Sequence, residues 1–191
     1  RRHHGVDNPT FKDVKEYYDN TLHPDVINLS DSNVYENIFH KGKGGGTFQF
    51  TEAGVQKYCT QVKPNSIIDL SIITSTYRPG PLAAKVHDQF LEAKENPQSV
   101  KYVNDIHREI TEETHGFLIF QEQIALLAHK LGKNLTLDEG NKLRKVLTKK
   151  GTGKEARVKK KLFTKFIDGC VESGLRQATA ERLWETFEYF S

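Results

Sequence analysis

The sequence predicts an all-α fold with at most minor strand content, on three observations. From Thr47 onward, apolar residues recur mostly at i, i+3 and i+4, the spacing of one face of an α-helix. Glycine, proline and capping residues separate these periodic segments at intervals typical of short globular helices. Alternating apolar and polar runs, which would indicate strands, are scarce, and no segment repeats another.

Residues 1–45 differ from the rest because turn-forming clusters interrupt them. We expect a short irregular connecting arm there, followed by a helical domain over residues 46–191. Two short helices are expected within the arm, over Phe11–Tyr18 and Ser32–His40. The arm is expected to pack on a partner or on another domain. Whether residues 1–25 form the edge of a neighbouring domain stays open at this point.

The helices of the main domain are delimited by caps and breakers. We expect them over Glu52–Val62, Ile67–Ser75, 82–94, 99–114 and Phe117–Leu131, then from a Thr136 cap, after Gly153, and over 177–190. Thr136 and Glu139 form a capping box, and Gly116, Gly132 and Gly174 are expected helix ends. Two prolines in Tyr77–Pro81 predict a rigid non-helical corner that aims Arg78 outward.

The most apolar segment, Phe117–Leu131, predicts a buried core helix. It carries Gln121, Glu122 and Gln123, which are polar. These side chains are expected either to form hydrogen bonds inside the fold or to face a cleft, and the sequence favours neither alternative.

The positive charge of the chain is concentrated between Lys142 and Lys161. Ten Lys and Arg residues stand there against one acidic residue, Glu155, whereas the remainder holds 18 basic and 24 acidic residues. Glycines at 151 and 153 interrupt the run, so basic helix ends and free backbone amides come together, which suits a polyanion. The alternative is an ordinary solvated face.

The sequence lacks the residue patterns that several classes of function require. The chain has neither an apolar run that could span a membrane nor a secretory signal. Cys59 and Cys170 are far apart, so we expect reduced core thiols in a cytosolic-type compartment. No two acidic residues stand at i and i+2, a common arrangement for two-metal nucleotidyl transfer, and zinc-ligand spacing and a phosphate-binding loop are also missing. We therefore expect no catalytic residue and no metal ligand in this chain.

Four motifs follow one another along the chain: Gly46–Phe50 with Gly54, Tyr77–Pro81, Glu113–Gln123 and Asn141–Lys150. They resemble, in turn, the G-x-F-Q-x-E-S-x-G, Y-R-P-G-P, E-T-Y-G-x-x-x-Y-Q-E-Q and A-D-x-L-R-R-A-M-G-K-K motifs of the C-family replicative DNA polymerases of bacteria, the DNA polymerase III alpha subunits. The resemblance covers about residues 26–191, and the order and spacing of the motifs make it specific.

The resemblance implies an all-helical fingers domain beside a palm that lies outside this chain and holds the catalytic aspartates and Mg²⁺. It implies template–primer DNA, dNTP and the remaining polymerase segments as partners, and the cytoplasm of a bacterial cell or of a virus-infected host cell as the location. The residues expected at the nucleotide phosphates are Arg78, Arg144, Lys145, Lys149 and Lys150, and those expected to line the cleft are Gln49, Tyr77, Gln121 and Gln123. Charge alone assigns Lys154, Arg157, Lys159 and Lys160 to the DNA backbone.

The chain also departs from the family pattern. Thr51 and Glu52 replace E-S, His115 replaces the tyrosine of E-T-Y-G, and Thr148 replaces the glycine of G-K-K. These departures are typical of a divergent member, for example a virus-encoded one, and we expect an internal piece of a polymerase or one product of a split gene.

Two alternatives remain beside the polymerase. One is a non-enzymatic nucleic-acid-binding module that has kept the polymerase architecture. The other is an interaction domain whose N-terminal arm docks a partner.

Overall fold

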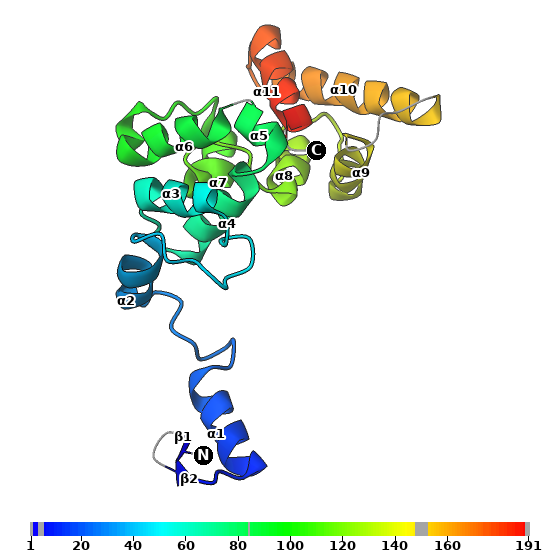
Figure 1. The fold of residues 1–191 in the computed structure, drawn as a ribbon. Coiled ribbons are helices and arrows are strands. Elements are labelled where there is room, and N and C mark those ends of the chain that lie inside the picture. Colours follow the sequence, from blue (N-terminus) through cyan, green and yellow to red (C-terminus); the bar gives the residue numbers. More distant parts are fainter. Residues whose placement is uncertain (1, 4–5, 84, 148–152, 190–191) are drawn as a thin grey trace.

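The N-terminal arm extends away from the helical body in the computed structural model, which describes residues 2–3, 6–83, 85–147 and 153–189 (Figure 1). Its elements are the paired strands β1 (Arg2–His3) and β2 (Val6–Asp7), helices α1 (Phe11–Thr21) and α2 (Ser32–Val34), and a π-helical turn over Tyr35–Phe39. Thr10 and Asp13 cap α1 reciprocally, yet no residue of α1 is buried. Tyr35 and Phe39 are buried, and the π-helical turn that carries them packs against α3 of the body.

The body is a succession of helices, and the all-α prediction is confirmed. They are α3 (Ala53–Val62), α4 (Ile67–Thr76), α5 (Pro79–Ala83), α6 (Val86–Glu95), α7 (Asp105–Thr111), α8 (Gln121–Leu131), α9 (Leu137–Leu147), α10 (Lys154–Glu172) and α11 (Gln177–Tyr189). Single 3₁₀ turns lie at Pro97–Ser99 and Glu112–Thr114. The arm–domain division at residue 45 stays a prediction.

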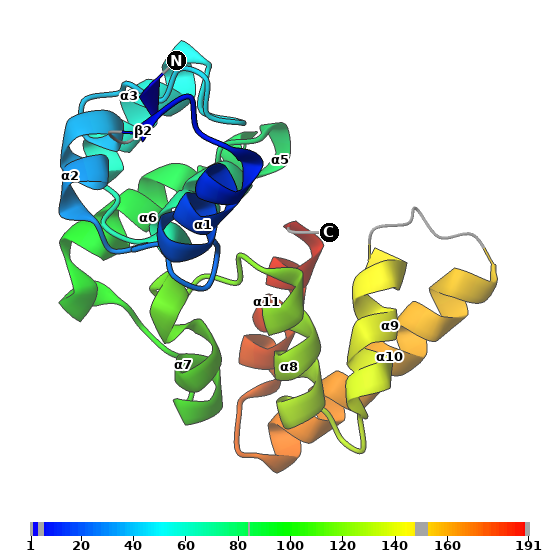
Figure 2. The same ribbon diagram turned by 90° about the horizontal axis from the view of Figure 1, so that it is seen from below.

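Helix α8 lies at the centre of the C-terminal half. It packs against α7 on one side and against α9 and α10 on another (Figure 2). Ile124 and Leu127 are among its core residues, and Leu143 of α9 is fully buried. Phe166 of α10 packs on Trp184 and Phe187 of α11, with ring centroids 5.6 and 5.2 Å apart. Burial of these apolar faces is the main stabilising contribution to such helix packing.

Two helices approach the α8 segment so closely that only glycine fits. A Cβ atom on Gly140 of α9 would lie 2.5 Å from the Ala125 carbonyl oxygen, and one on Gly169 of α10 would lie 2.2 Å from the Leu131 carbonyl oxygen. Real Cβ contacts are not that short. At the second approach, the Lys133 amide donates a hydrogen bond to the Lys165 carbonyl at 2.8 Å. Backbone therefore meets backbone where α10 crosses the end of α8.

Most predicted helix ends are confirmed. Thr136 and Glu139 form the capping box, with the Thr136 amide donating to Glu139 at 3.1 Å and the Glu139 amide donating to Thr136 at 3.2 Å. Gly132 follows α8, and Gly174, with φ of 90°, follows α10. Gly116, with φ of 86°, stands just after the Glu112–Thr114 turn.

Three predictions about the elements are wrong. The segment from Pro79 is helical, because prolines in a first turn lack only amides that have no partner within the helix anyway. The helix expected over 99–114 begins only at Asp105, where Asn104 caps it by accepting from the His107 amide at 2.8 Å. The core helix begins at Gln121 rather than Phe117, because residues 117–120 are not helical, with extended backbone at Phe120, and they are buried or half-buried. A short apolar run does not by itself distinguish a buried extended segment from a buried helix.

A buried ion pair joins α4 to α6. The Lys94 ammonium lies 2.5 Å from the Asp69 carboxylate, and only 16% and 8% of the two side chains are exposed. The same carboxylate oxygen accepts from the Asn65 amide at 2.9 Å. Two partners on one buried oxygen satisfy the charge, and breaking such a pair is more costly than breaking a surface pair.

Cys59 and Cys170 are free and buried, as predicted. Burial raises the pKa of the Cys59 thiol to about 11 and that of Cys170 to about 12, so both side chains act as small apolar groups. Among the described helices, none has the length and apolar character to cross a bilayer.

Replacing Gly169 with alanine is expected to destabilise the fold by roughly 3 kcal/mol, because the new methyl group meets backbone atoms that cannot move aside. Gly45→Ala is the control, since Gly45 has open space around it and its φ is not positive. It should be neutral or stabilising by up to about 1 kcal/mol. Urea unfolding measures both, and equal stability of the two variants would contradict the close approach.

Acidic pH is expected to lower the free energy of unfolding through His107. Burial lowers the pKa of the His107 imidazole, whose Nδ1 accepts from the Val103 amide at 3.5 Å, so the folded state favours the neutral ring. Burial also lowers the pKa of His115, with a smaller contribution from Lys94 and an opposing one from Asp69. An unfolded histidine has a pKa of about 6.5, so below that pH the unfolded chain binds more protons and stability falls.

Urea denaturation over a pH series from neutral to about 5 measures this slope. His107→Asn keeps an acceptor but cannot titrate, so it should flatten the slope. His23→Asn, on a side chain of the arm that is 42% exposed, should preserve it. An unchanged slope in His107→Asn would show that protonation of His107 is not coupled to unfolding.

Candidate nucleotide- and DNA-binding surface

The corner between α4 and α5 presents Arg78 to solvent, as predicted. Behind it, the half-buried Tyr77 ring stacks on Tyr58 with centroids 5.8 Å and planes 28° apart, and meets His87 edge-on at 6.4 Å. The Tyr58 hydroxyl donates to the His87 carbonyl at 2.9 Å, and burial raises its pKa to about 12. Tyr77 is thus held between two aromatic rings, and the backbone that carries Arg78 is braced from inside.

Gly54 makes room for this corner. A Cβ atom at Gly54 in α3 would lie 2.0 Å from the Tyr77 hydroxyl oxygen and 2.9 Å from its Cζ. Because stacking holds the Tyr77 ring, it cannot easily retreat from a larger residue. The glycine of the first motif and the tyrosine of the second therefore form one structural unit, which their separation in the sequence did not indicate.

Gln49 stands in the loop that leads into α3. Its side chain is exposed, and its φ of 64° is in the left-handed region. The next residue, Phe50, is buried against Phe39 with ring centroids 5.3 Å apart, and its carbonyl accepts from Gln56 at 3.1 Å. The buried phenylalanine anchors the loop and leaves Gln49 on the surface.

The three polar residues at the start of α8 do not share one environment: one forms hydrogen bonds inside the fold, and the other two are on the surface. Gln121 and Glu122 are exposed, whereas Gln123 is 7% exposed. The side-chain oxygen of Gln123, Oε1, accepts hydrogen bonds from the backbone amides of Ile119 and Phe120 at 2.8 and 2.9 Å. Its amide nitrogen donates to the Ile110 carbonyl at 3.0 Å and to the Thr114 hydroxyl at 2.9 Å.

All of these Gln123 partners lie inside the fold. The structure therefore places Gln123 in the core position, not in an open cleft, and its amide ties residues 110–120 to α8. Gln121 stays available for the cleft role that the resemblance implies.

Arg144 is positioned by Glu122. The Arg144 Nη1 atom lies 2.7 Å from the Glu122 carboxylate, and 26% of the Arg144 side chain is exposed. The contact crosses from α9 to the first turn of α8. Sequence reasoning missed Glu122 as a partner, because its 22-residue separation from Arg144 follows only from how α8 and α9 pack.

The other predicted basic residues are partly described. Lys145 of α9 is exposed, as are Arg157 and Lys160 of α10, while Lys159 is half-buried. Lys149 and Lys150, and the side chain of Lys154, lie outside the described residues. Helices α9 and α10 pack against each other, so the described basic residues occupy two adjoining helices (Figure 2).

The predicted residues form two groups. Tyr77 and Arg78 belong to the α4–α5 corner, whereas Gln121, Arg144 and the other cations among the described residues belong to α8, α9 and α10. Within the described residues, no hydrogen bond or ion pair joins Arg78 to the second group. A ligand that touches both groups would have to bridge them itself.

Gln123→Leu is expected to destabilise the chain by about 3 kcal/mol, because it leaves two amides, a carbonyl and a hydroxyl without this partner. Gln121→Leu, two residues earlier on the exposed face, should change stability by no more than about 0.5 kcal/mol. Urea denaturation of both variants is the measurement. Equal losses would contradict the division between a core amide and a surface amide.

The family model described as "Bacterial DNA polymerase III alpha subunit finger domain" matches residues 8–174. The chain is similar to the DNA polymerase III subunit alpha of Campylobacter jejuni, with 31% identity over 97% of this chain and 15% of that protein. It is 32% identical to the protein of the same name from Aquifex aeolicus, over 85% of this chain and 14% of that protein. It thus spans about a seventh of the length of these relatives. The chain belongs to the family of bacterial DNA polymerase III alpha subunit finger domains.

Proposed function

We propose that this chain is the fingers part of a DNA-directed DNA polymerase, a nucleotidyltransferase, and that it binds the triphosphate of the incoming dNTP and the template–primer DNA. The family match supports the proposal because it includes the Arg78 corner, the start of α8 and the whole of α9. Since the chain corresponds to a small part of its relatives, the activity is proposed for an assembly and not for this chain alone.

The observation that carries the proposal is the exposed Arg78 on a braced corner. Its side chain has no hydrogen bond or ion pair among the described residues, while Tyr77 is stacked on Tyr58 directly behind it. The guanidinium is thus presented to solvent from a backbone that is held in place. A planar guanidinium suits two parallel hydrogen bonds to a phosphate.

Arg144 and Lys145 supply further positive charge from α9. A phosphate that binds Arg144 would compete with the Glu122 carboxylate for the same guanidinium. Lys145 would act as a more flexible point charge. Lys149 and Lys150 keep their predicted role at the phosphates. Together these cations would neutralise the negative charge that develops on the leaving pyrophosphate.

The exposed residues of α10 are proposed to contact the DNA backbone. Arg157 and Lys160 are accessible there, and Lys154 and Lys159 keep the same predicted role. Phosphate contacts of this kind are independent of base sequence and weaken as salt rises. Gln49, Tyr77 and Gln121 are proposed to line the cleft near the nascent base pair.

Mg²⁺ is the cofactor that nucleotidyl transfer ordinarily requires. Among the described residues, no group of three or more His, Cys, Asp or Glu side chains is placed to hold a metal ion, so these residues do not fit a magnesium site. We propose that palm residues outside this chain hold the metal. The remaining polymerase segments are therefore partners, and the cytoplasm of a bacterial cell or of a virus-infected host cell stays the predicted location.

In the assembled polymerase, Arg78→Ala is expected to lower kcat/KM for dNTP by roughly 100-fold, because a preorganised charge on the leaving phosphates is removed. Single-nucleotide primer extension measures this loss. Arg176→Ala is the matched control, since Arg176 is an exposed arginine before α11, outside the family match. Both variants should keep the stability of the parent chain.

Normal dNTP kinetics in Arg78→Ala would refute the assignment of Arg78. If the assembly extends primers equally well without this chain, while the chain alone binds DNA in a salt-dependent manner, the non-enzymatic nucleic-acid-binding module is the correct function.

A further inference from the structure

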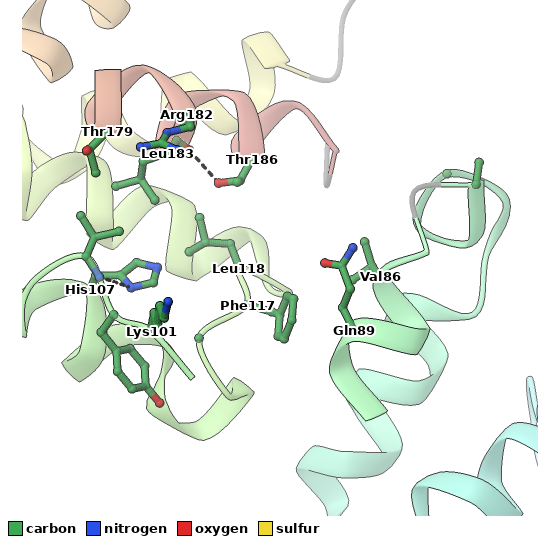
Figure 3. A pocket seen from close by; sticks show the side chains of 15 residues that line it. Val86, Gln89, Lys101, His107, Phe117, Leu118, Thr179, Arg182, Leu183 and Thr186 are labelled. Carbon is green, nitrogen blue, oxygen red and sulfur yellow. Dashed lines mark hydrogen bonds between the residues drawn. The ribbon is translucent and has the colours of Figure 1, made fainter. Parts of the chain in front are cut away.

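A large cavity lies between three separate parts of the fold. Its volume is about 1080 Å³, slightly above the usual range for small-molecule sites, which is about 300–1,000 Å³. One wall is formed by α5 and α6, a second by the segments around Lys101–His107 and Gly116–Leu118, and the third by α11 (Figure 3). None of the motifs that identify the family predicted this cavity.

The interior of the cavity is mainly apolar. The second wall contributes Phe117 and Leu118, α6 contributes Val86 and α11 contributes Leu183 (Figure 3). The Phe117 ring is half-buried, so it offers an aromatic surface to an occupant. An apolar body that fills this space would remove its own surface and that of the Phe117 ring from water.

The charged groups at the cavity are all cationic. Lys101 and Arg182 line it from two different walls, both with exposed side chains. Arg182 donates from Nε to the Ala178 carbonyl at 3.3 Å, which leaves its terminal nitrogens for other acceptors. Among the described lining residues there is no Asp or Glu to neutralise the two charges.

We propose that this cavity binds a small organic anion with an aromatic or branched apolar body and a single anionic head. The body would lie against Phe117 and Leu183, and Lys101 and Arg182 on their separate walls would supply the positive charge that attracts the head. Charge complementarity selects an anion over a neutral or cationic ligand of the same shape.

Occupancy would have a consequence for the Arg78 corner. The cavity is lined by Gly80 and Ala83 of α5, the helix that begins directly after Arg78, and by Thr179 and Thr186 of α11. A bound ligand would therefore bridge the α4–α5 corner to the C-terminal helices. This surface is distinct from the predicted phosphate-binding residues on α9.

Binding can be located by fluorescence. The probe is 1-anilinonaphthalene-8-sulfonate, which combines an aromatic body with one sulfonate. N-phenyl-1-naphthylamine has a similar body without a charge and is the comparison ligand. The chain has a single tryptophan, Trp184, which is buried beside the cavity-lining Leu183. Energy transfer from Trp184 distinguishes probe in the cavity from probe on the exposed apolar residues of the arm.

With the full 191-residue chain, the anionic probe should bind roughly tenfold or more tightly than the neutral one, as expected for one or two charge-assisted hydrogen bonds. Lys101→Gln with Arg182→Gln should abolish that difference and leave the neutral probe unaffected. Thr179→Phe fills the cavity and should weaken both probes. Lys63→Gln with Arg176→Gln, two exposed cations outside the cavity lining, should change neither.

Equal affinity for the two probes in the parent chain would overturn the anion selectivity. Anionic-probe binding that withstands the Lys101 and Arg182 substitutions, or that shows no energy transfer from Trp184, would overturn the site. Circular dichroism of each variant ensures that a loss of binding is not a loss of fold.

Discussion

The close approach of α9 and α10 to α8 is the constraint on which the C-terminal half depends. Glycines at 140 and 169 let helix backbone meet helix backbone where any side chain would collide with carbonyl or amide atoms. The position of α9 follows from this approach, and with it the position of Arg144 over the first turn of α8. The electrostatic surface is thus a product of packing, and the ion pair with Glu122 then sets the direction of the Arg144 guanidinium.

Capping and stop signals made much of the fold predictable. The Thr136–Glu139 box and the glycines at 116, 132 and 174 act through local backbone chemistry, which a sequence displays directly. The errors arose where local chemistry allows two outcomes. Prolines in Tyr77–Pro81 are compatible with a corner and with a helical first turn, and the apolar residues 117–120 suit a strand-like segment as well as a helix.

The candidate site was less predictable than the fold, since its geometry is set by contacts between distant segments. Gln121 and Gln123 are the same residue type two positions apart, yet one is exposed and the other bonds four groups of the fold. A helix turns about 200° between such positions, so the direction of the core decides their roles. The charge count identified the basic helices but could not indicate that Glu122 is opposite Arg144.

The contact between Gly54 and Tyr77 has an evolutionary consequence. A Cβ atom at position 54 and a phenol at position 77 cannot occupy the same space, so the two positions are not free to vary independently. A descendant that gained a larger residue at 54 would first need a smaller one at 77. Until then, the Tyr77 hydroxyl restricts position 54 to glycine, and the aromatic brace behind Arg78 depends on a residue that belongs to a different motif.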